Sequence, residues 1–105
     1  SQYPHENSAE CFFDRAVRFR PDDGQVRFVY AMHLHGLKQL ELAREQYALA
    51  EKLGVSTPNF YYNYGLVLSD LRDWEAAREY AQKAYAGGFS LQGLRQRLTA
   101  AGFPP

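Results

Sequence analysis

The side chains that could carry out chemistry are few, and their spacing limits what they can do. His33 and His35 stand two residues apart, and imidazole is a common metal ligand. Side chains two residues apart on a helix point about 200° away from each other, so these two cannot hold one ion together. No third ligand follows at a suitable spacing. We therefore expect no metal site, and we interpret both histidines as packing or solvent-facing residues.

Motifs for nucleophilic catalysis and phosphate binding are also missing from the sequence. Cys11 is the sole cysteine, and no histidine stands near it at a spacing that suggests activation of its thiol. The chain contains no glycine-rich phosphate loop and no hydrolase elbow. We therefore expect no catalytic residues, no cofactor and no enzymatic activity.

Arginines gather in one short segment that could meet an acidic partner. These are Arg15, Arg18 and Arg20. Asp14, Asp22 and Asp23 stand close enough to neutralise their charge. Such a run is more often a solvated helix face. Over the whole chain, 12 Lys and Arg residues balance 12 Asp and Glu residues. A chain without net charge has no general attraction to phosphate backbones, so we expect no nucleic-acid partner.

Size and composition indicate one folded domain. The 105 residues allow a single modest core, and 46% hydrophobic with 15% aromatic residues exceeds what disordered segments contain. No run of about 18 apolar residues occurs, so we expect no membrane insertion. No signal peptide opens the chain, although one could have been removed. A single cysteine excludes an internal disulfide but leaves the compartment open between cytoplasm and periplasm.

The elements that must position these residues are helices. Apolar residues recur at spacings of three and four and are interrupted by glycine, proline and aspartate, a pattern that predicts six helices and no strand. The expected helices cover about residues 8–20, 26–37, 39–53, 58–71, 74–86 and 91–101. The expected N-terminal caps are Asn7 or Ser8, Thr57 with Pro58, Asp73 and Ser90. Glycines should end the helices at positions 36, 54, 87 to 88 and 102.

Small residues recur at a fixed interval along these helices. An interval of 34 residues separates successive members of two sets of alanines, Ala9, Ala43 and Ala77, and Ala16, Ala50 and Ala84. A period of this length marks an array of helical repeats, in which each unit hides its apolar stripe by stacking on its neighbours. We expect alanine to let two helices approach closely, and the larger Phe13 and Tyr47 to fill the space between successive units.

The repeating residues resemble the tetratricopeptide repeat family, whose 34-residue unit carries Trp-x2-Leu-Gly-x2-Tyr, then Ala-x3-Phe, then proline. The best match comprises Tyr61-x2-Tyr64-Gly65-x2-Leu68 and Ala77-x3-Ala81 followed by Ala84. The preceding unit offers Arg27-x2-Tyr30-Ala31-x2-Leu34 and Ala43-x3-Tyr47 followed by Ala50. The first segment supplies only Ala9-x3-Phe13, followed by Ala16 and Pro21.

The resemblance implies an all-α fold, an α-solenoid of antiparallel helix pairs that forms a right-handed superhelical array with a C-terminal capping helix. It divides the single domain, residues 1–105, into the second half of a repeat (1–23), two full repeats (24–57 and 58–91) and a capping helix with a tail (92–105). The segment from Gly87 to Gly102 is similar to bacterial members of the family.

The resemblance also implies a protein interaction module or scaffold, because members of this family usually bind a protein or peptide on the concave face. The residues carried over to that groove are Gln25, Phe28, Met32, His35, Gly36, Asn59, Tyr62, Leu66, Ser69 and Asp70. Their apolar and aromatic character favours an apolar or amphipathic peptide segment, within a bacterial envelope, secretion or pilus assembly complex. Only Asn63 resembles the clamp with which some members grip the terminal carboxylate of chaperones.

The first repeat lacks its first helix, which predicts an uncovered apolar face on the segment that remains. Phe12, Phe13 and Val17 should lie on that face. Three explanations stay open: the chain is a fragment of a longer array, it pairs with a second copy, or residues 1–7 fold over the face. The alternative function is therefore a structural unit that forms a homo-oligomer through its N-terminal helix.

Overall fold

The computed structural model describes residues 8–105, and within this range the chain is all-helical and contains no strand. The helices are α1 (Ser8–Phe19), α2 (Gly24–Gly36), α3 (Leu40–Lys52), α4 (Pro58–Asp70), α5 (Trp74–Ala86) and α6 (Gly93–Ala100). The prediction of an all-α chain with six helices is confirmed for the described residues. The expected cap at Asn7 lies outside them.

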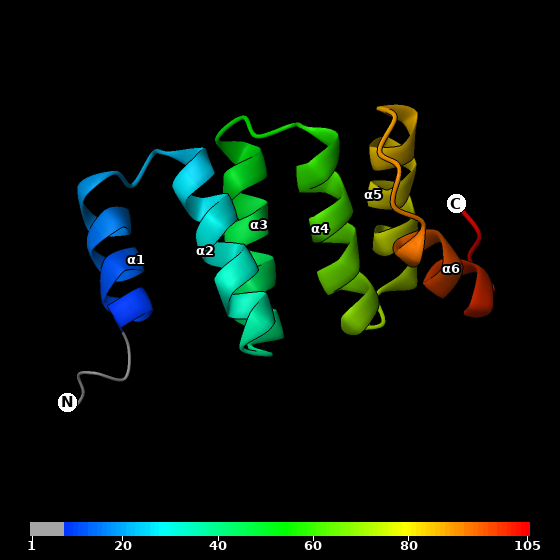
Figure 1. The fold of residues 1–105 in the computed structure, drawn as a ribbon, viewed down its shortest axis with the longest axis horizontal. Helices are drawn as coiled ribbons and strands as arrows, with labels where there is room; N and C mark the ends of the chain where they lie inside the picture. Colours follow the sequence, from blue (N-terminus) through cyan, green and yellow to red (C-terminus); the bar gives the residue numbers. More distant parts are fainter. Residues whose placement is uncertain (1–7) are drawn as a thin grey trace.

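The helices stand side by side in the order of the sequence (Figure 1). α2 packs closely on α3, and α4 packs closely on α5. A short turn joins the two helices of each pair, and each pair therefore forms a helical hairpin. The two hairpins meet through contacts of α3 and α2 with α4. α1 contacts only α2 among the described helices, whereas α6 packs on both α4 and α5 at the opposite end of the molecule.

Small residues lie where the helices of a hairpin approach most closely. Ala43 and Ala77 expose none of their surface. A Cβ atom added to Gly65 would lie 2.5 Å from Leu94 Cδ2 and 3.5 Å from the carbonyl oxygen of Ala77. Since real Cβ atoms keep more than 3 Å from their neighbours, Leu94 of α6 occupies space that only glycine leaves open. The contact of this position with the Ala77 carbonyl agrees with the close approach expected there, whereas Ala9, expected to lie at a similar approach, is exposed.

Aromatic rings fill the wider space between the two hairpins. Tyr47 is fully buried at the centre of this cluster, with its ring centroid 6.0 Å from Phe28, 5.8 Å from Phe60 and 5.2 Å from Tyr64. The rings of Tyr47 and Tyr64 are stacked, whereas those of Phe28 and Phe60 meet edge to face at 5.1 Å. Each buried aromatic side chain removes about 150–250 Å² from water, so this cluster joins the hairpins into one core.

Helix ends follow one hydrogen-bonding pattern. The residues with positive φ that follow α2 to α6 are Lys38, Gly54, Arg72, Gly88 and Gly102. In each case the next N–H donates to a carbonyl five residues earlier, as in Gln39 to Leu34 at 3.0 Å and Val55 to Ala50 at 3.1 Å. The glycine expected to end α2, Gly36, is instead its last helical residue, and a lysine takes the left-handed conformation two positions later.

Helix starts are capped by side chains where the sequence offers a local acceptor. Thr57 Oγ1 accepts from the N–H of Phe60 at 3.3 Å with Pro58 in the first turn, and Asp73 accepts from the N–H of Ala76 at 3.4 Å. Both predicted caps are confirmed. Asp23, which is not among the predicted caps, caps α2 through the N–H groups of the two residues after Gly24.

The start of α6 differs from the expectation. Ser90 does not cap it, and the helix begins three residues later at Gly93, so Leu91 lies outside the helix and is 57% exposed. The reason is a contact from another helix: Tyr85 Oη donates to the carbonyl of Leu91 at 2.8 Å and accepts from the N–H of Arg95 at 3.1 Å. A hydroxyl group from α5 thus satisfies backbone groups on both sides of the helix start.

Candidate functional site

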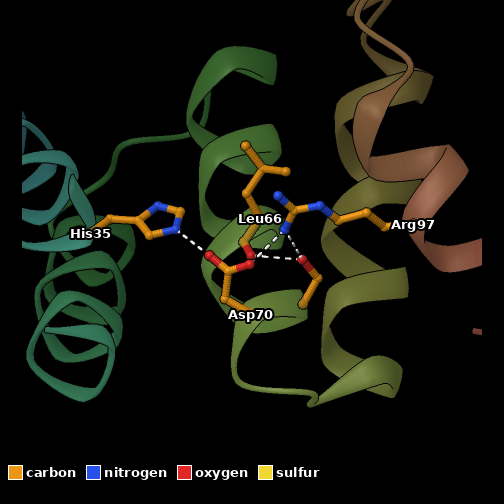
Figure 2. A network of polar contacts seen from close by, with 5 residues as sticks. His35, Leu66, Asp70 and Arg97 are labelled. Carbon is orange, nitrogen blue, oxygen red and sulfur yellow. Dashed lines mark hydrogen bonds and ion pairs between the residues drawn. The ribbon is translucent and has the colours of Figure 1, made fainter. Parts of the chain in front are cut away.

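A network of polar side chains connects α2, α4 and α6, which contact one another in this order (Figure 2). Asp70 of α4 is the central acceptor. Its Oδ2 lies 2.6 Å from His35 Nε2 of α2, and its Oδ1 accepts from Arg97 Nη1 of α6 at 2.7 Å. The same guanidinium nitrogen donates to Ser69 Oγ at 2.8 Å, and that hydroxyl donates to the carbonyl of Leu66 at 2.7 Å. Three helices therefore meet at one carboxylate.

Local sequence explains why these groups meet. Leu66, Ser69 and Asp70 are separated by three and four residues, so they share one face of α4. His35 lies in the last turn of α2, and the contact between α2 and α4 brings it to the C-terminal end of α4. Arg97 reaches the same point from the last turn of α6.

The electrostatics of Asp70 reflect two opposing effects. Partial burial by itself would raise the pKa of this carboxyl group. The hydrogen bond from His35 and the positive charge and hydrogen bond of Arg97 lower it, and they outweigh burial, so that the pKa lies below its ordinary value. The carboxylate is therefore charged at neutral pH, with both oxygens occupied, and it holds the Arg97 side chain in place.

Arg97 has hydrogen-bond donors that the network does not use. Its side chain is 47% exposed, and its protein contacts within residues 8–105 use Nη1 alone. The other donors of the guanidinium, on Nη2 and Nε, have no partner in that range. Guanidinium groups bind carboxylates through two parallel N–H bonds, so the free edge of Arg97 is suited to a carboxylate.

The predicted groove residues differ in how much of their surface is exposed in the structure. Gln25 and Asn59 are exposed, Met32, His35 and Leu66 are partly buried, and Ser69 is buried with its hydroxyl in the network. Phe28 and Tyr62, expected to offer aromatic surface to a partner, are only 3% and 7% exposed. Their rings pack within the molecule and cannot line an open groove.

The two aromatic residues are covered by neighbours that the repeat pattern does not specify. Phe28 is covered by Phe60, which precedes the predicted groove position Tyr62 of α4 by two residues. Tyr62 packs against Phe89 with a centroid distance of 4.6 Å, and Phe89 belongs to the turn between α5 and α6. The accessible part of the predicted surface is therefore its polar and aliphatic part.

The sequence analysis does not identify Arg97, because it assigns residues 92–105 to a capping helix and tail without a role in binding. A signal was present, since Arg97 follows Asn63 by one repeat interval, and Asn63 was the one residue with a likeness to a carboxylate clamp. Continuing the period into the last helix would have placed Arg97 in register with that position.

The residues predicted for self-association also differ in how exposed they are. Phe12 is 61% exposed and Val17 is partly buried, but Phe13 is only 7% exposed. The Phe13 ring stacks on Tyr30 at 5.2 Å and lies 5.0 Å from His33, so it holds α1 on α2 and is not available to a partner. This corrects the expectation for Phe13.

His33 and His35 serve different contacts, as their spacing on the helix requires. His33 Nε2 lies 3.1 Å from Glu10 Oε2 on α1, and His35 faces α4. Within residues 8–105, no three histidine, cysteine, aspartate or glutamate side chains gather where they could hold a metal ion.

Comparison of the chain with models of known protein families and with curated protein sequences finds no match. A search of the described helices for a segment long and apolar enough to cross a membrane finds none either.

Proposed function

We propose that this chain is a tetratricopeptide-like interaction module that binds a protein or peptide segment on the surface formed by α2, α4 and α6. Three features support the fold part of the proposal. Ala43 and Ala77, one repeat interval apart, lie buried in successive hairpins, Gly65 faces Ala77 at a close approach, and Tyr47 fills the space between hairpins. A right-handed superhelical solenoid, closed by α6, accounts for all three together.

The observation that carries the binding proposal is the half-used guanidinium of Arg97. Asp70 and Ser69 fix one nitrogen, and the remaining donors have no hydrogen-bond partner within the described chain. Met32 and Leu66 add partly buried aliphatic surface on α2 and α4. The ligand that fits is an amphipathic peptide segment with a carboxylate for Arg97 and apolar side chains beside it.

The mechanism is docking without covalent chemistry. Exposed amide groups of Gln25 and Asn59, at the first turns of α2 and α4, can bond the backbone of an extended segment. The resemblance to bacterial family members extends this proposal to a scaffold within an envelope, secretion or pilus assembly complex.

Selection of peptides from a displayed random library on the immobilised chain tests the proposal. We expect the selected peptides to carry Asp, Glu or a free C-terminus at a fixed distance from apolar residues. Arg97→Gln should weaken their binding about tenfold or more, because a charge-assisted hydrogen bond contributes about 1.5–3 kcal/mol.

Arg95→Gln is the matched control. It removes the same charge from the same helix, but the Arg95 guanidinium lies 4.3 Å from the ring centroid of Tyr85 and away from the network. Circular dichroism of both variants verifies that α6 is retained. Equal binding by the two variants would show that the peptides do not use Arg97, and the proposed surface would be wrong.

A further inference from the structure

His35 is the residue of the α2, α4 and α6 network whose charge can change near neutral pH. Histidine is the residue type that gains a proton between pH 8 and pH 5, whereas an arginine keeps its charge. Asp70 stays ionised in this range, because its pKa lies below its ordinary value. Figure 2 shows the Asp70 carboxylate between the side chains of His35 and Arg97. The protonation state of His35 therefore decides the charge of the whole network.

The hydrogen bond between His35 and Asp70 determines which ring nitrogen takes up a proton. An ionised carboxylate only accepts hydrogen bonds, so Nε2 of His35, 2.6 Å from Asp70 Oδ2, carries a hydrogen even in the neutral ring. The added proton must then bind Nδ1, which has no hydrogen-bond partner within residues 8–105 and keeps access to solvent. Protonation thus leaves the ring and its bond to Asp70 in place and changes the charge alone.

The charged groups that face His35 are Asp70 and, on the other oxygen of that carboxylate, Arg97. α1 and α3 also pack on α2, but their acidic residues that form ion pairs do so with other partners. These pairs are Glu10 with His33, Asp14 with Arg18, Glu41 with Arg44, and Glu51 with Lys83. Lys38 and Arg72, in the turns after α2 and α4, belong to residue types that stay charged in this range and add a constant background. The network of His35, Asp70 and Arg97 is therefore neutral above the titration of His35 and carries one positive charge below it.

We propose that protonation of His35 strengthens the binding of a carboxylate at Arg97, a regulation that rests on the proposed function of this surface. While His35 is neutral, the charge of Asp70 is matched by that of Arg97 alone. Once His35 is protonated, one carboxylate serves two cations, and the positive charge of Arg97 is less compensated toward a ligand on its free edge. The surface then binds acidic peptide segments more tightly as the pH falls.

The size of the effect follows from the added charge. Three hydrogen bonds and two planar groups in series separate the His35 ring from a carboxylate on the free edge of Arg97, which places the two charges on the order of 10 Å apart. Coulomb's law at this distance gives an affinity gain of about twofold in bulk water and about fifteenfold near a protein surface. Because binding and protonation are linked, a ligand that binds the protonated form better must also take up protons when it binds.

Peptides selected by display on the immobilised chain, restricted to those without histidine, are the probes for this regulation. Isothermal titration calorimetry measures their dissociation constants at pH values of about 5.5, 6.5 and 8, at constant ionic strength. Pairs of buffers with different heats of ionisation report the proton uptake. We expect severalfold tighter binding at the lowest pH and uptake of a fraction of a proton per peptide. His35→Gln, which keeps an N–H donor for Asp70, should bind with one affinity at all three pH values and take up no proton.

His33→Gln is the matched control. It removes an imidazole from the same helix, but one that contacts Glu10 of α1 instead of the network. This variant should keep both the pH profile and the proton uptake. Binding that Arg97→Gln weakens but that does not change with pH would overturn the regulation and leave the proposed function intact. Equal binding by Arg97→Gln and Arg95→Gln would overturn both.

Nuclear magnetic resonance of the ¹⁵N-labelled chain without any peptide tests the coupling inside the protein. The Nε resonance of Arg97 should shift over the same pH range as the ring resonances of His35. His35→Gln should abolish that shift, and His33→Gln should retain it. An Arg97 resonance that stays constant while His35 titrates would refute the coupling, whether or not display yields peptides. Circular dichroism of each variant verifies that the helices are retained.

Discussion

Replacement of Tyr47 by phenylalanine should stabilise the fold, although it removes a polar group from a residue at the centre of the core. Tyr47 exposes none of its surface, and its hydroxyl oxygen has no hydrogen-bond partner within the described residues. Burial accordingly raises the pKa of the phenol above its ordinary value. The ring packs between the two hairpins, and phenylalanine would preserve those contacts.

The expected magnitude follows from the hydroxyl alone. A buried hydroxyl group without a partner costs about 1–3 kcal/mol relative to its hydrated state in the unfolded chain. The space left by one oxygen atom offsets part of the gain, because the neighbouring rings lose contacts. We therefore expect Tyr47→Phe to increase the free energy of unfolding by about 1 kcal/mol, which corresponds to roughly 5 °C in Tm for a domain of this size.

Tyr80→Phe is the matched comparison. Tyr80 also stacks on Tyr64, at a centroid distance of 4.2 Å, but its hydroxyl donates to Glu51 Oε1 at 2.6 Å. Removing this bond to a charged acceptor should lower the free energy of unfolding by about 1 kcal/mol. The same chemical change is thus expected to have opposite effects on stability at two rings that both stack on Tyr64.

Urea and thermal unfolding followed by circular dichroism measure both variants against the unaltered chain. Tyr47→Phe should move the urea midpoint upward with an unchanged slope, and Tyr80→Phe should move it downward. A downward shift of the midpoint in Tyr47→Phe, reproduced by a lower Tm, would mean that the Tyr47 hydroxyl has a partner, and the reasoning from its burial would be refuted.

Three further predictions concern the carboxylate, the close helix approach and the helix ends. The pKa of Asp70 is lower in the folded chain than in the unfolded one, so its contribution to stability is complete above the unfolded value of about 3.9 and is lost as the pH falls toward the folded value. The difference in urea midpoint between the unaltered chain and Asp70→Asn should therefore shrink between pH 6 and pH 3, and a constant difference would contradict this. Ala77→Leu should lower the free energy of unfolding by about 1–3 kcal/mol, since no space exists at this fully buried residue; an unchanged urea midpoint would refute it. Gly36→Ala should raise Tm slightly and Gly54→Ala should lower it, because both positions are open to solvent but only Gly54 has a positive φ, of 102°; equal shifts in a thermal scan would disprove the role given to the backbone angle.

The sequence predicts this fold well wherever the cause is local. Thr57 before Pro58, and Asp73, cap helices because their acceptor atoms reach amides three residues ahead, and no distant part of the chain is needed. The start of α6 could not be predicted in this way. It depends on the hydroxyl of Tyr85, which reaches the backbone of Leu91 and Arg95 from the preceding helix.

The candidate site shows the same division. The repeat register indicates which face of α2 and α4 carries His35, Leu66 and Ser69, because that depends on helical period alone. It does not indicate which side chains on the face stay accessible. Phe28 is covered by Phe60 of α4. Tyr62 is covered by Phe89, which lies in a turn whose conformation cannot be predicted from the repeat period.

The proposed function gives Arg97 a recognition role in addition to its structural contacts, and this affects how a ligand would bind. Its contacts with Asp70 and Ser69 hold the side chain in one orientation before a ligand arrives, so less conformational entropy is lost on binding than at a free surface arginine. The charges of Arg97 and Asp70 largely cancel, and the whole chain carries no net charge. Attraction over long distances is therefore weak, and discrimination must come from the geometry of the unused donors and the aliphatic surface beside them. Binding at such a site should depend on the spacing between a ligand's carboxylate and its apolar groups more than on the number of its negative charges.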